Sequence, residues 1–367
     1  MNYYQKELNS IKKVNRLRTR KLFDTDLIDL GSNDYLGLSS KKSLLKKTYK
    51  KLKKEKYFSP KASLLVNGYS QIHQEFETKL CELNDFESGI VVGSGFLANI
   101  ALIESLVRKK DILFIDEQYH ASGMLATKLV QGEVVIFKHN DTLDLESKIA
   151  ALEYTPNRII IAIEGVYSMG GDIAPKKFDA IASTHNAILL VDEAHSSGVI
   201  GNNLLGWFDY HQITPQSNHI KMGTLGKAYS SYGAYILASE HIISFLENRA
   251  KPIIYGTAPS LFDISLALTN LNYLQKKKEK IKNKIRKNQA LVRNILEIDC
   301  DSLIVPIEIG DNKKVIEIQN RLIEKGYVVG AIRQPTVYKA IIRLIIKLDI
   351  QKSDLKEVLR YLKNEVS

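Results

Sequence analysis

The stretch from Ile188 to Gly201 reads Ile-Leu-Leu-Val-Asp-Glu-Ala-His-Ser-Ser-Gly-Val-Ile-Gly. Its apolar first part predicts a buried strand, and the chain becomes polar directly afterwards, at Asp192 and His195. In an open and mainly parallel sheet, ligands bind beyond the carboxyl ends of the strands. We therefore expect Asp192 and His195 to lie at a ligand site.

The string Asp-Glu-Ala-His also occurs in helicases, and the chain carries a formal net charge of +11. A helicase would in addition need a phosphate-binding loop of the form GxxxxGK[ST]. The only Gly-Lys pair is Gly226-Lys227, which lacks a glycine five residues before Gly226 and is followed by Ala228. The sequence therefore argues against a nucleic-acid partner.

Two further interpretations of Asp192 and His195 concern a metal and an organic cofactor. A catalytic zinc site needs three clustered protein ligands, and the neighbouring positions offer only serine and glycine, so no metal is expected. Alternatively, Asp192 pairs with the pyridine nitrogen of pyridoxal phosphate, which a lysine further along the chain carries as a Schiff base. Lys227 fits this role, because it lies 35 residues on, after a short apolar strand and between small residues.

A relaxed dinucleotide-binding fingerprint leaves a nicotinamide-dependent dehydrogenase open as a remote alternative. Gly93, Gly95 and Ala98 follow a predicted strand and precede a helix predicted over 100–107, and Asp116 lies where a ribose-binding acid belongs. Against this, about 90 residues without a βα repeat precede the motif. Exposed amides at a helix N-terminus bind any phosphate, including that of pyridoxal phosphate.

The middle of the chain alternates strictly between predicted strands and helices. This alternation predicts an α/β fold with a mainly parallel central sheet and helices on both faces. We expect an N-terminal arm and segment at 1–45, a large cofactor-binding domain at 46–255, and a long helix with a small C-terminal α/β domain at 256–367. The strands are expected at 112–115, 134–137, 159–163 and 188–191, an arm helix at 3–18, and the long helix from about 260 to 298.

Composition and charge narrow the possible location and partners. The 367 residues, 44% of them apolar, contain no stretch long enough to span a membrane and no signal-peptide pattern at the start, so a cytoplasmic protein without membrane contact is expected. Residues 1–56 hold 16 Lys or Arg against 6 Asp or Glu, and residues 276–287 hold 8 against 1. These tracts are either solvated helix faces or a landing surface for an acidic partner such as coenzyme A or an acyl carrier protein.

Seven segments together resemble the α-oxoamine synthases, fold type I pyridoxal phosphate enzymes that condense an amino acid with an acyl thioester. In chain order they are SNDYLGL from Ser32, NGYSQIHQEFE from Asn67, GSGFLAN from Gly93, EGVYSMGGD from Glu164, LLVDEAHSSGVIG from Leu189, GTLGKA from Gly223 and AIRQPTV from Ala331.

The resemblance implies how the cofactor is held. Lys227 would carry pyridoxal phosphate and move a proton at the substrate α-carbon, and Asp192 would pair with the pyridine nitrogen. His120 would stack on the ring, while His195 and Ser168 would reach its phenolic oxygen. The phosphate would be held by the backbone of Gly95 and Phe96, by the Thr224 hydroxyl, and by Thr257 of a neighbouring subunit, which implies a homodimer.

The resemblance also implies the substrate contacts. Arg343 would bind the amino-acid carboxylate through a bidentate contact. Asn33 and His120 would also contact substrate, and Arg18 and Thr336 would line the acyl channel. We expect L-alanine and a pimeloyl thioester of coenzyme A or an acyl carrier protein as substrates. Glycine or serine with another acyl-coenzyme A remains the alternative.

Overall fold

The computed structural model describes residues 3–366, which form two compact units. The large unit comprises residues 36–168 and 172–283, and the small unit comprises residues 3–35, 169–171 and 284–366. Within these residues no helix is long and apolar enough to cross a membrane. The three-part division at 45/46 and 255/256 stays a prediction.

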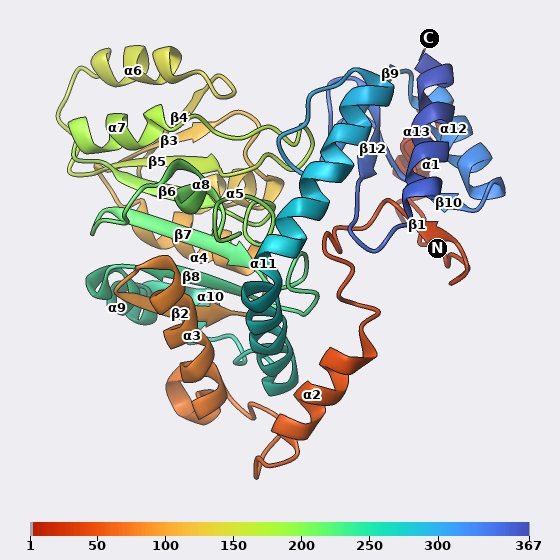
Figure 1. The fold of residues 1–367 in the computed structure, drawn as a ribbon. Helices are drawn as coiled ribbons and strands as arrows, with labels where there is room; N and C mark the ends of the chain where they lie inside the picture. Colours follow the sequence, from red (N-terminus) through yellow and green to blue (C-terminus); the bar gives the residue numbers. More distant parts are fainter. Residues whose placement is uncertain (1–2, 367) are drawn as a thin grey trace. The chain divides into compact units, whose positions relative to one another are not determined.

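A seven-stranded sheet forms the centre of the large unit, with the strand order β2-β8-β7-β6-β5-β3-β4 (Figure 1). β8 runs antiparallel to both of its neighbours, and all other pairings are parallel. The expected mainly parallel sheet is therefore confirmed. The strands are β2 Ser88–Val92, β3 Ile112–Asp116, β4 Glu133–Phe137, β5 Ile159–Glu164, β6 Ile188–Asp192, β7 His219–Thr224 and β8 Ala234–Ala238.

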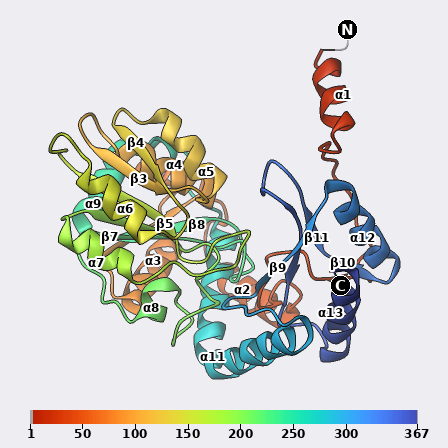
Figure 2. The same ribbon diagram turned by 90° about the horizontal axis from the view of Figure 1, so that it is seen from above.

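Helices cover both faces of this sheet, with α4 and α5 on one side of the strands and α7 and α8 on the other (Figure 2). The central strands are buried on both faces, which explains why β6 and β3 are continuously apolar up to their last residues, Asp192 and Asp116, rather than alternating. The helices are α2 Lys42–Leu52, α3 Gln71–Asn84, α4 Gly95–Leu106, α5 Ala121–Ala126, α6 Thr142–Ala150, α7 Lys177–Thr184, α8 Trp207–His211, α9 Glu240–Arg249 and α10 Lys251–Ile254.

Helix α4 begins five residues before the predicted start at Ile100. Ser94 is its N-cap, and the Ser94 Oγ accepts a hydrogen bond from the Leu97 amide at 3.3 Å. The glycine-rich appearance of Gly93 to Gly95 favoured a loop, but the cap and the apolar residues behind it extend the helix. Gly95 and Phe96 therefore form the first turn of α4 rather than a separate turn.

The small unit contains an antiparallel sheet of order β11-β12-β9 and the parallel pair β1-β10. The predicted long helix is confirmed as α11 Leu261–Leu296.

The arm helix is shorter than expected, and its apolar side chains Tyr4, Leu8, Ile11 and Val14 are exposed. The remaining elements are α1 Gln5–Lys13, β1 Ile28–Asp29, β9 Ile304–Gly310, α12 Asn312–Glu324, β10 Tyr327–Val328, β11 Gly330–Ile332, β12 Ala340–Ile345 and α13 Lys352–Val366.

A histidine held between two acids ties the edge of the large sheet to the loop after β5. His139 Nδ1 lies 3.1 Å from Asp116 Oδ1, and its Nε2 lies 2.9 Å from Asp172 Oδ2. Asn140 donates to both carboxylates as well. Burial alone would lower the pKa of His139, but the hydrogen bonds and charges of Asp116 and Asp172 outweigh it and raise that pKa to about 9.

We expect His139 to make the stability of the fold fall between pH 6.5 and 9.5. Because its pKa is higher in the folded chain than in the unfolded chain, its contribution is complete below about pH 6.5 and is lost as pH rises through about 9. The free energy of unfolding, measured with urea, should fall by on the order of 2–3 kcal/mol over this range. The His139→Gln variant should lose this slope, and the exposed-site control His241→Gln should keep it. An equal slope in the His139→Gln variant would contradict the assignment.

Candidate active site

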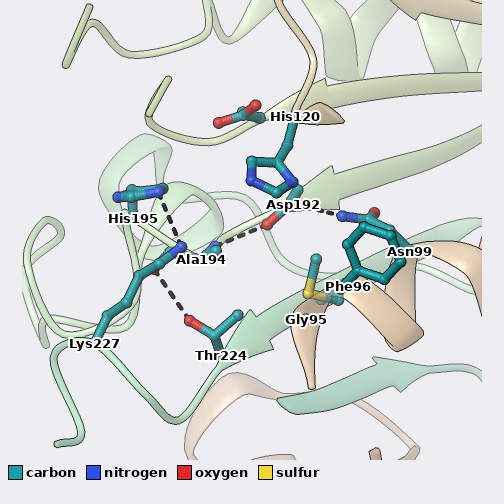
Figure 3. A pocket seen from close by; sticks show the side chains of 11 residues that line it. Gly95, Phe96, Asn99, His120, Asp192, Ala194, His195, Thr224 and Lys227 are labelled. Carbon is teal, nitrogen blue, oxygen red and sulfur yellow. Dashed lines mark hydrogen bonds between the residues drawn. The ribbon is translucent and has the colours of Figure 1, made fainter. Parts of the chain in front are cut away.

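The carboxyl ends of β5, β6 and β7 and the start of α4 surround a cavity of about 230 Å³ in the large unit (Figure 3). It lies where a parallel sheet is expected to bind its ligand. The lining residues are Gly95, Phe96, Asn99, His120, Glu164, Asp192, Ala194, His195, Met222, Thr224 and Lys227. The structure thus brings together seven residues that the sequence predicted for a cofactor site: Gly95, Phe96, His120, Asp192, His195, Thr224 and Lys227.

Asp192, the last residue of β6, is buried and held by two donors. The Ala194 amide donates to Oδ1 at 3.0 Å, and Asn99 Nδ2 donates to Oδ2 at 2.8 Å. Because a carboxylate oxygen can accept more than one hydrogen bond, these contacts orient Asp192 and leave it able to accept a further donor. A protonated pyridine nitrogen is such a donor.

Lys227 and His195 meet on the opposite side of the cavity. Lys227 Nζ lies 2.9 Å from His195 Nε2, and Lys227 lies three residues after the end of β7. One of these nitrogens has to accept a hydrogen bond from the other, so the two groups are not both cationic. A neutral His195 can accept from Lys227 through Nε2, and this contact holds the lysine amine at the cavity, where a nucleophilic lysine is needed.

The start of α4 and Thr224 form a cradle that fits a phosphate. The first amides of a helix have no acceptor within the helix, and the helix dipole favours an anion there. A Cβ at position 95 would lie 2.5 Å from Thr224 Cγ2, so glycine is required for the helix to begin this close to the threonine. The donor set therefore matches the phosphate of pyridoxal phosphate.

His120 and Glu164 complete the cavity with two groups whose pKa values are both shifted toward the uncharged form. Burial and the nearby Lys227 lower the pKa of His120, and the charge of Asp192 only partly opposes them. Burial and then the charge of Asp192 raise the pKa of Glu164 well above its ordinary value. The Glu164 Oε2 accepts a hydrogen bond from the Ser168 amide at 3.1 Å.

Ser168 and Thr257 belong to the large unit but are not among the residues lining this cavity. Ser168 is buried, four residues beyond the end of β5. Thr257 is exposed and forms an isolated antiparallel bridge with Ser63. Their predicted contacts with the phenolic oxygen and with a neighbouring subunit's phosphate stay predictions.

The predicted substrate residues meet in pairs within the small unit. Arg343 Nη1 donates to Asn33 Oδ1 at 3.0 Å, and Arg18 Nη2 donates to Thr336 Oγ1 at 3.1 Å. A cavity of about 90 Å³ beside the second pair is lined by Arg16, Arg18, Ala331, Ile332, Arg333, Gln334 and Thr336. Three guanidinium groups around a small, partly apolar space are suited to an organic anion.

The sequence interpretation missed several cavity residues, above all Asn99, Ala194 and Met222. Asn99 was visible as the last residue of GSGFLAN, and a helix beginning at Gly95 places residues 95 and 99 on one face. The predicted start at Ile100 concealed this relation. Asp116 does not have the role of a ribose-binding acid, because its buried carboxylate is occupied by Gln118, His139 and Asn140.

A lysine opposite an aspartate, beside a phosphate cradle on a mainly parallel sheet, is the arrangement of a fold type I pyridoxal phosphate enzyme. The chain belongs to the aminotransferase class I and II family, whose sequence profile matches residues 25–362. It is 46% identical over 357 residues to 8-amino-7-oxononanoate synthase of Helicobacter pylori (strain J99 / ATCC 700824), covering 97% of this chain and 95% of that protein. The predicted resemblance to the α-oxoamine synthases is thereby confirmed.

Solved structures agree with this family. A crystal structure of 8-amino-7-oxononanoate synthase from Francisella tularensis has a TM-score of 0.75 and 26% identity, covering 94% of this chain and 98% of that one. A serine palmitoyltransferase from S. paucimobilis has a TM-score of 0.90 and covers 100% of this chain and 98% of that one, and at 23% identity it shows the shared fold alone.

We expect Gly95→Ala to weaken the binding of pyridoxal phosphate by at least about tenfold, because the added Cβ collides with Thr224 Cγ2 and displaces the start of α4. The double variant Gly95→Ala/Thr224→Ser removes that methyl group and keeps the hydroxyl, so it should recover much of the affinity. Titration of the apoprotein, followed by cofactor absorbance, measures both. Full affinity in the Gly95→Ala variant would contradict a phosphate site at this turn.

Proposed function

We propose that this protein condenses L-alanine with a pimeloyl thioester, releasing CO₂ and giving 8-amino-7-oxononanoate for biotin biosynthesis. It is a pyridoxal phosphate-dependent acyltransferase. The observation that carries the proposal is the cavity that joins Asp192, His120 and Lys227 to the α4 phosphate cradle, in a chain 46% identical to a protein named for this product.

Pyridoxal phosphate, when bound, supplies an electron sink that stabilises negative charge at the α-carbon of an amino acid. The α4 amides and Thr224 would hold its phosphate, and Asp192 would hold the proton on its pyridine nitrogen. Lys227 would be the covalent attachment point, and its amine would move a proton at the substrate α-carbon. His120 would contact the ring, and His195 and Ser168 would serve the phenolic oxygen.

Two arginines are the proposed partners of the two substrate carboxylates. Arg343, oriented by Asn33, binds the carboxylate of the amino acid. The distal carboxylate of a pimeloyl chain needs a partner as it leaves water, because its burial alone would cost several kcal/mol. Arg18 provides this partner, Thr336 orients Arg18, and Arg16 and Arg333 add positive charge.

A different amino acid and acyl-coenzyme A, as in other α-oxoamine synthases, is the alternative within the same chemistry. The relatives favour the dicarboxylic substrate, since a protein of Aquifex aeolicus named putative 8-amino-7-oxononanoate synthase is 33% identical over 372 residues, 99% of this chain and 97% of that protein. The three-arginine cavity favours it too, because its positive charge is suited to a terminal carboxylate and not to an apolar chain end.

The homodimer belongs to the same proposal. Thr257 is exposed on a segment that pairs with Ser63, and the large apolar side chains Leu65, Val66 and Tyr255 are exposed nearby in sequence. An exposed apolar surface of this kind is typical of a subunit interface. A second copy would bury it and would bring Thr257 to the partner's cofactor phosphate. A cytoplasmic location is proposed with it.

A shared site predicts that an inactive variant and a variant with weak cofactor binding complement each other in a mixed dimer. Lys227→Ala lacks the attachment point, and Thr257→Ala should bind pyridoxal phosphate about tenfold more weakly through loss of a charge-assisted hydrogen bond. In a mixed dimer, one site has both defects and the other has neither, so co-purified mixed dimers should regain roughly half of the wild-type activity per dimer at limiting cofactor. Activity no higher than the mean of the two parent variants would mean that Thr257 serves its own subunit.

The substrate assignment predicts that Arg18→Ala removes the preference for a dicarboxylic acyl donor. The ratio of kcat/KM for pimeloyl over heptanoyl thioester should fall at least about tenfold, because one charge-assisted pair is lost. Arg20→Ala, two residues away and exposed, is the matched control. An unchanged ratio would remove Arg18 from this role, and faster turnover of glycine with acetyl-coenzyme A would overturn the substrate assignment.

A further inference from the structure

A continuous network of hydrogen bonds connects Asp192, Asn99 and His120, three residues that line the cavity. Tyr119 Oη lies 2.8 Å from Asn99 Oδ1, and Asn99 Nδ2 lies 2.8 Å from Asp192 Oδ2. The same Asn99 Nδ2 lies 2.9 Å from Ser122 Oγ, which lies 2.7 Å from His120 Nδ1. Tyr119, Asn99, Asp192 and Ser122 are all at most 3% exposed.

Only one orientation of the Asn99 carboxamide is chemically consistent with this hydrogen-bond network. Both hydrogens of a carboxamide nitrogen can donate, whereas its oxygen can only accept. The nitrogen faces the Asp192 carboxylate and Ser122 Oγ, and the oxygen faces the Tyr119 hydroxyl, which therefore donates to it. All the hydrogen-bonding groups of the Asn99 side chain are thus used.

This orientation also fixes the proton of Ser122. Because Ser122 Oγ accepts from Asn99, its own hydrogen is available for His120 Nδ1. The Ser122 backbone amide, which can only donate, lies 3.2 Å from the same Nδ1, where His120 acts as N-cap of α5. Two donors therefore converge on Nδ1, and this nitrogen is the acceptor of the ring.

We infer that Asn99 is a positioning residue that holds the Asp192 carboxylate and, through Ser122, keeps the proton of neutral His120 on Nε2. Nε2 is then a hydrogen-bond donor and cannot act as a base. In the reaction proposed above, on which this role rests, His120 is suited to donate to a substrate carboxylate or carbonyl oxygen over the cofactor ring. One carboxamide thus serves both the pyridine nitrogen side and the face of the ring.

Alternatives to asparagine would break this dual role. An aspartate at position 99 would turn an acceptor oxygen toward the Asp192 carboxylate, and a leucine would leave Asp192 Oδ2 and Ser122 Oγ without this donor. A purely structural role for Asn99 would predict changes in stability only. The tautomer of His120 distinguishes the positioning role from this structural role.

The direct test is the ¹⁵N spectrum of the imidazole rings in the holoenzyme labelled with ¹⁵N-histidine, with the His120→Asn variant used for assignment. At pH 8, wild-type His120 should show a protonated Nε2 and an unprotonated Nδ1. Asn99→Ala and Ser122→Ala should each raise the fraction with the proton on Nδ1. Tyr119→Phe keeps both Asn99 donors and is the matched control, which should leave the tautomer unchanged. A wild-type ring with its proton on Nδ1 would overturn the inference.

Kinetics supply the second measurement. Asn99→Ala should lower kcat about tenfold to a hundredfold, as for other groups that orient a functional side chain, with less than a threefold change in KM for alanine. Tyr119→Phe should have a smaller effect. Equal losses in kcat for both variants, with an unchanged tautomer in Asn99→Ala, would reduce Asn99 to a structural residue. The tautomer is measured without substrate. The ¹⁵N result would therefore still test the role of Asn99 if alanine and a pimeloyl thioester proved not to be the substrates.

Discussion

The buried carboxylate of Asp192 is the constraint on which the rest of the cavity depends. A charged group at the end of a central strand has lost its water and has to be compensated by donors placed around it. The Ala194 amide comes from the chain's own turn, but the Asn99 donor comes from a helix 93 residues away in sequence. The position of α4 is therefore tied to the acid, and the same helix start forms the phosphate cradle.

Two consecutive acids at the end of β6 have different partners. Asp192, the last residue of the strand, lines the cavity, whereas Glu193, the next residue, is not in the lining and lies 3.2 Å from the buried Lys221. Glu193 Oε2 also accepts from Ser196 Oγ and the Trp207 amide, both at 2.6 Å. Removing one partner of such a buried pair is costly, so Glu193 and Lys221 fix the loop that carries His195.

The sequence predicted much of the fold because its signal is local. The apolar run before Asp192 and the regular alternation of strands and helices are sufficient for a parallel sheet and for a site at its edge. The antiparallel direction of β8 could not be predicted, because a buried strand has the same apolar sequence pattern in either direction. Helix α8 is five residues long, and its N-cap Gly206 packs against the Glu193 carboxylate, which a Cβ at position 206 would meet.

Site residues could be predicted from the sequence when their side-chain chemistry alone suggests a function. They could not be predicted when their function depends on which residues contact them in the fold. Lys227, Asp192 and His120 have side chains that a cofactor requires, so their order along the chain was informative. Asn99 and Ser122 are ordinary polar residues within helices, and their function depends on which atoms face them across the sheet edge. His120 shows the difference most clearly, because its presence is a property of the sequence but its tautomer is a property of the fold. Two donors on Nδ1 together keep the proton on Nε2: the Ser122 amide, placed by the start of α5, and the Ser122 hydroxyl, oriented by Asn99. The tautomer of His120 therefore depends on both the local backbone and a side chain of α4.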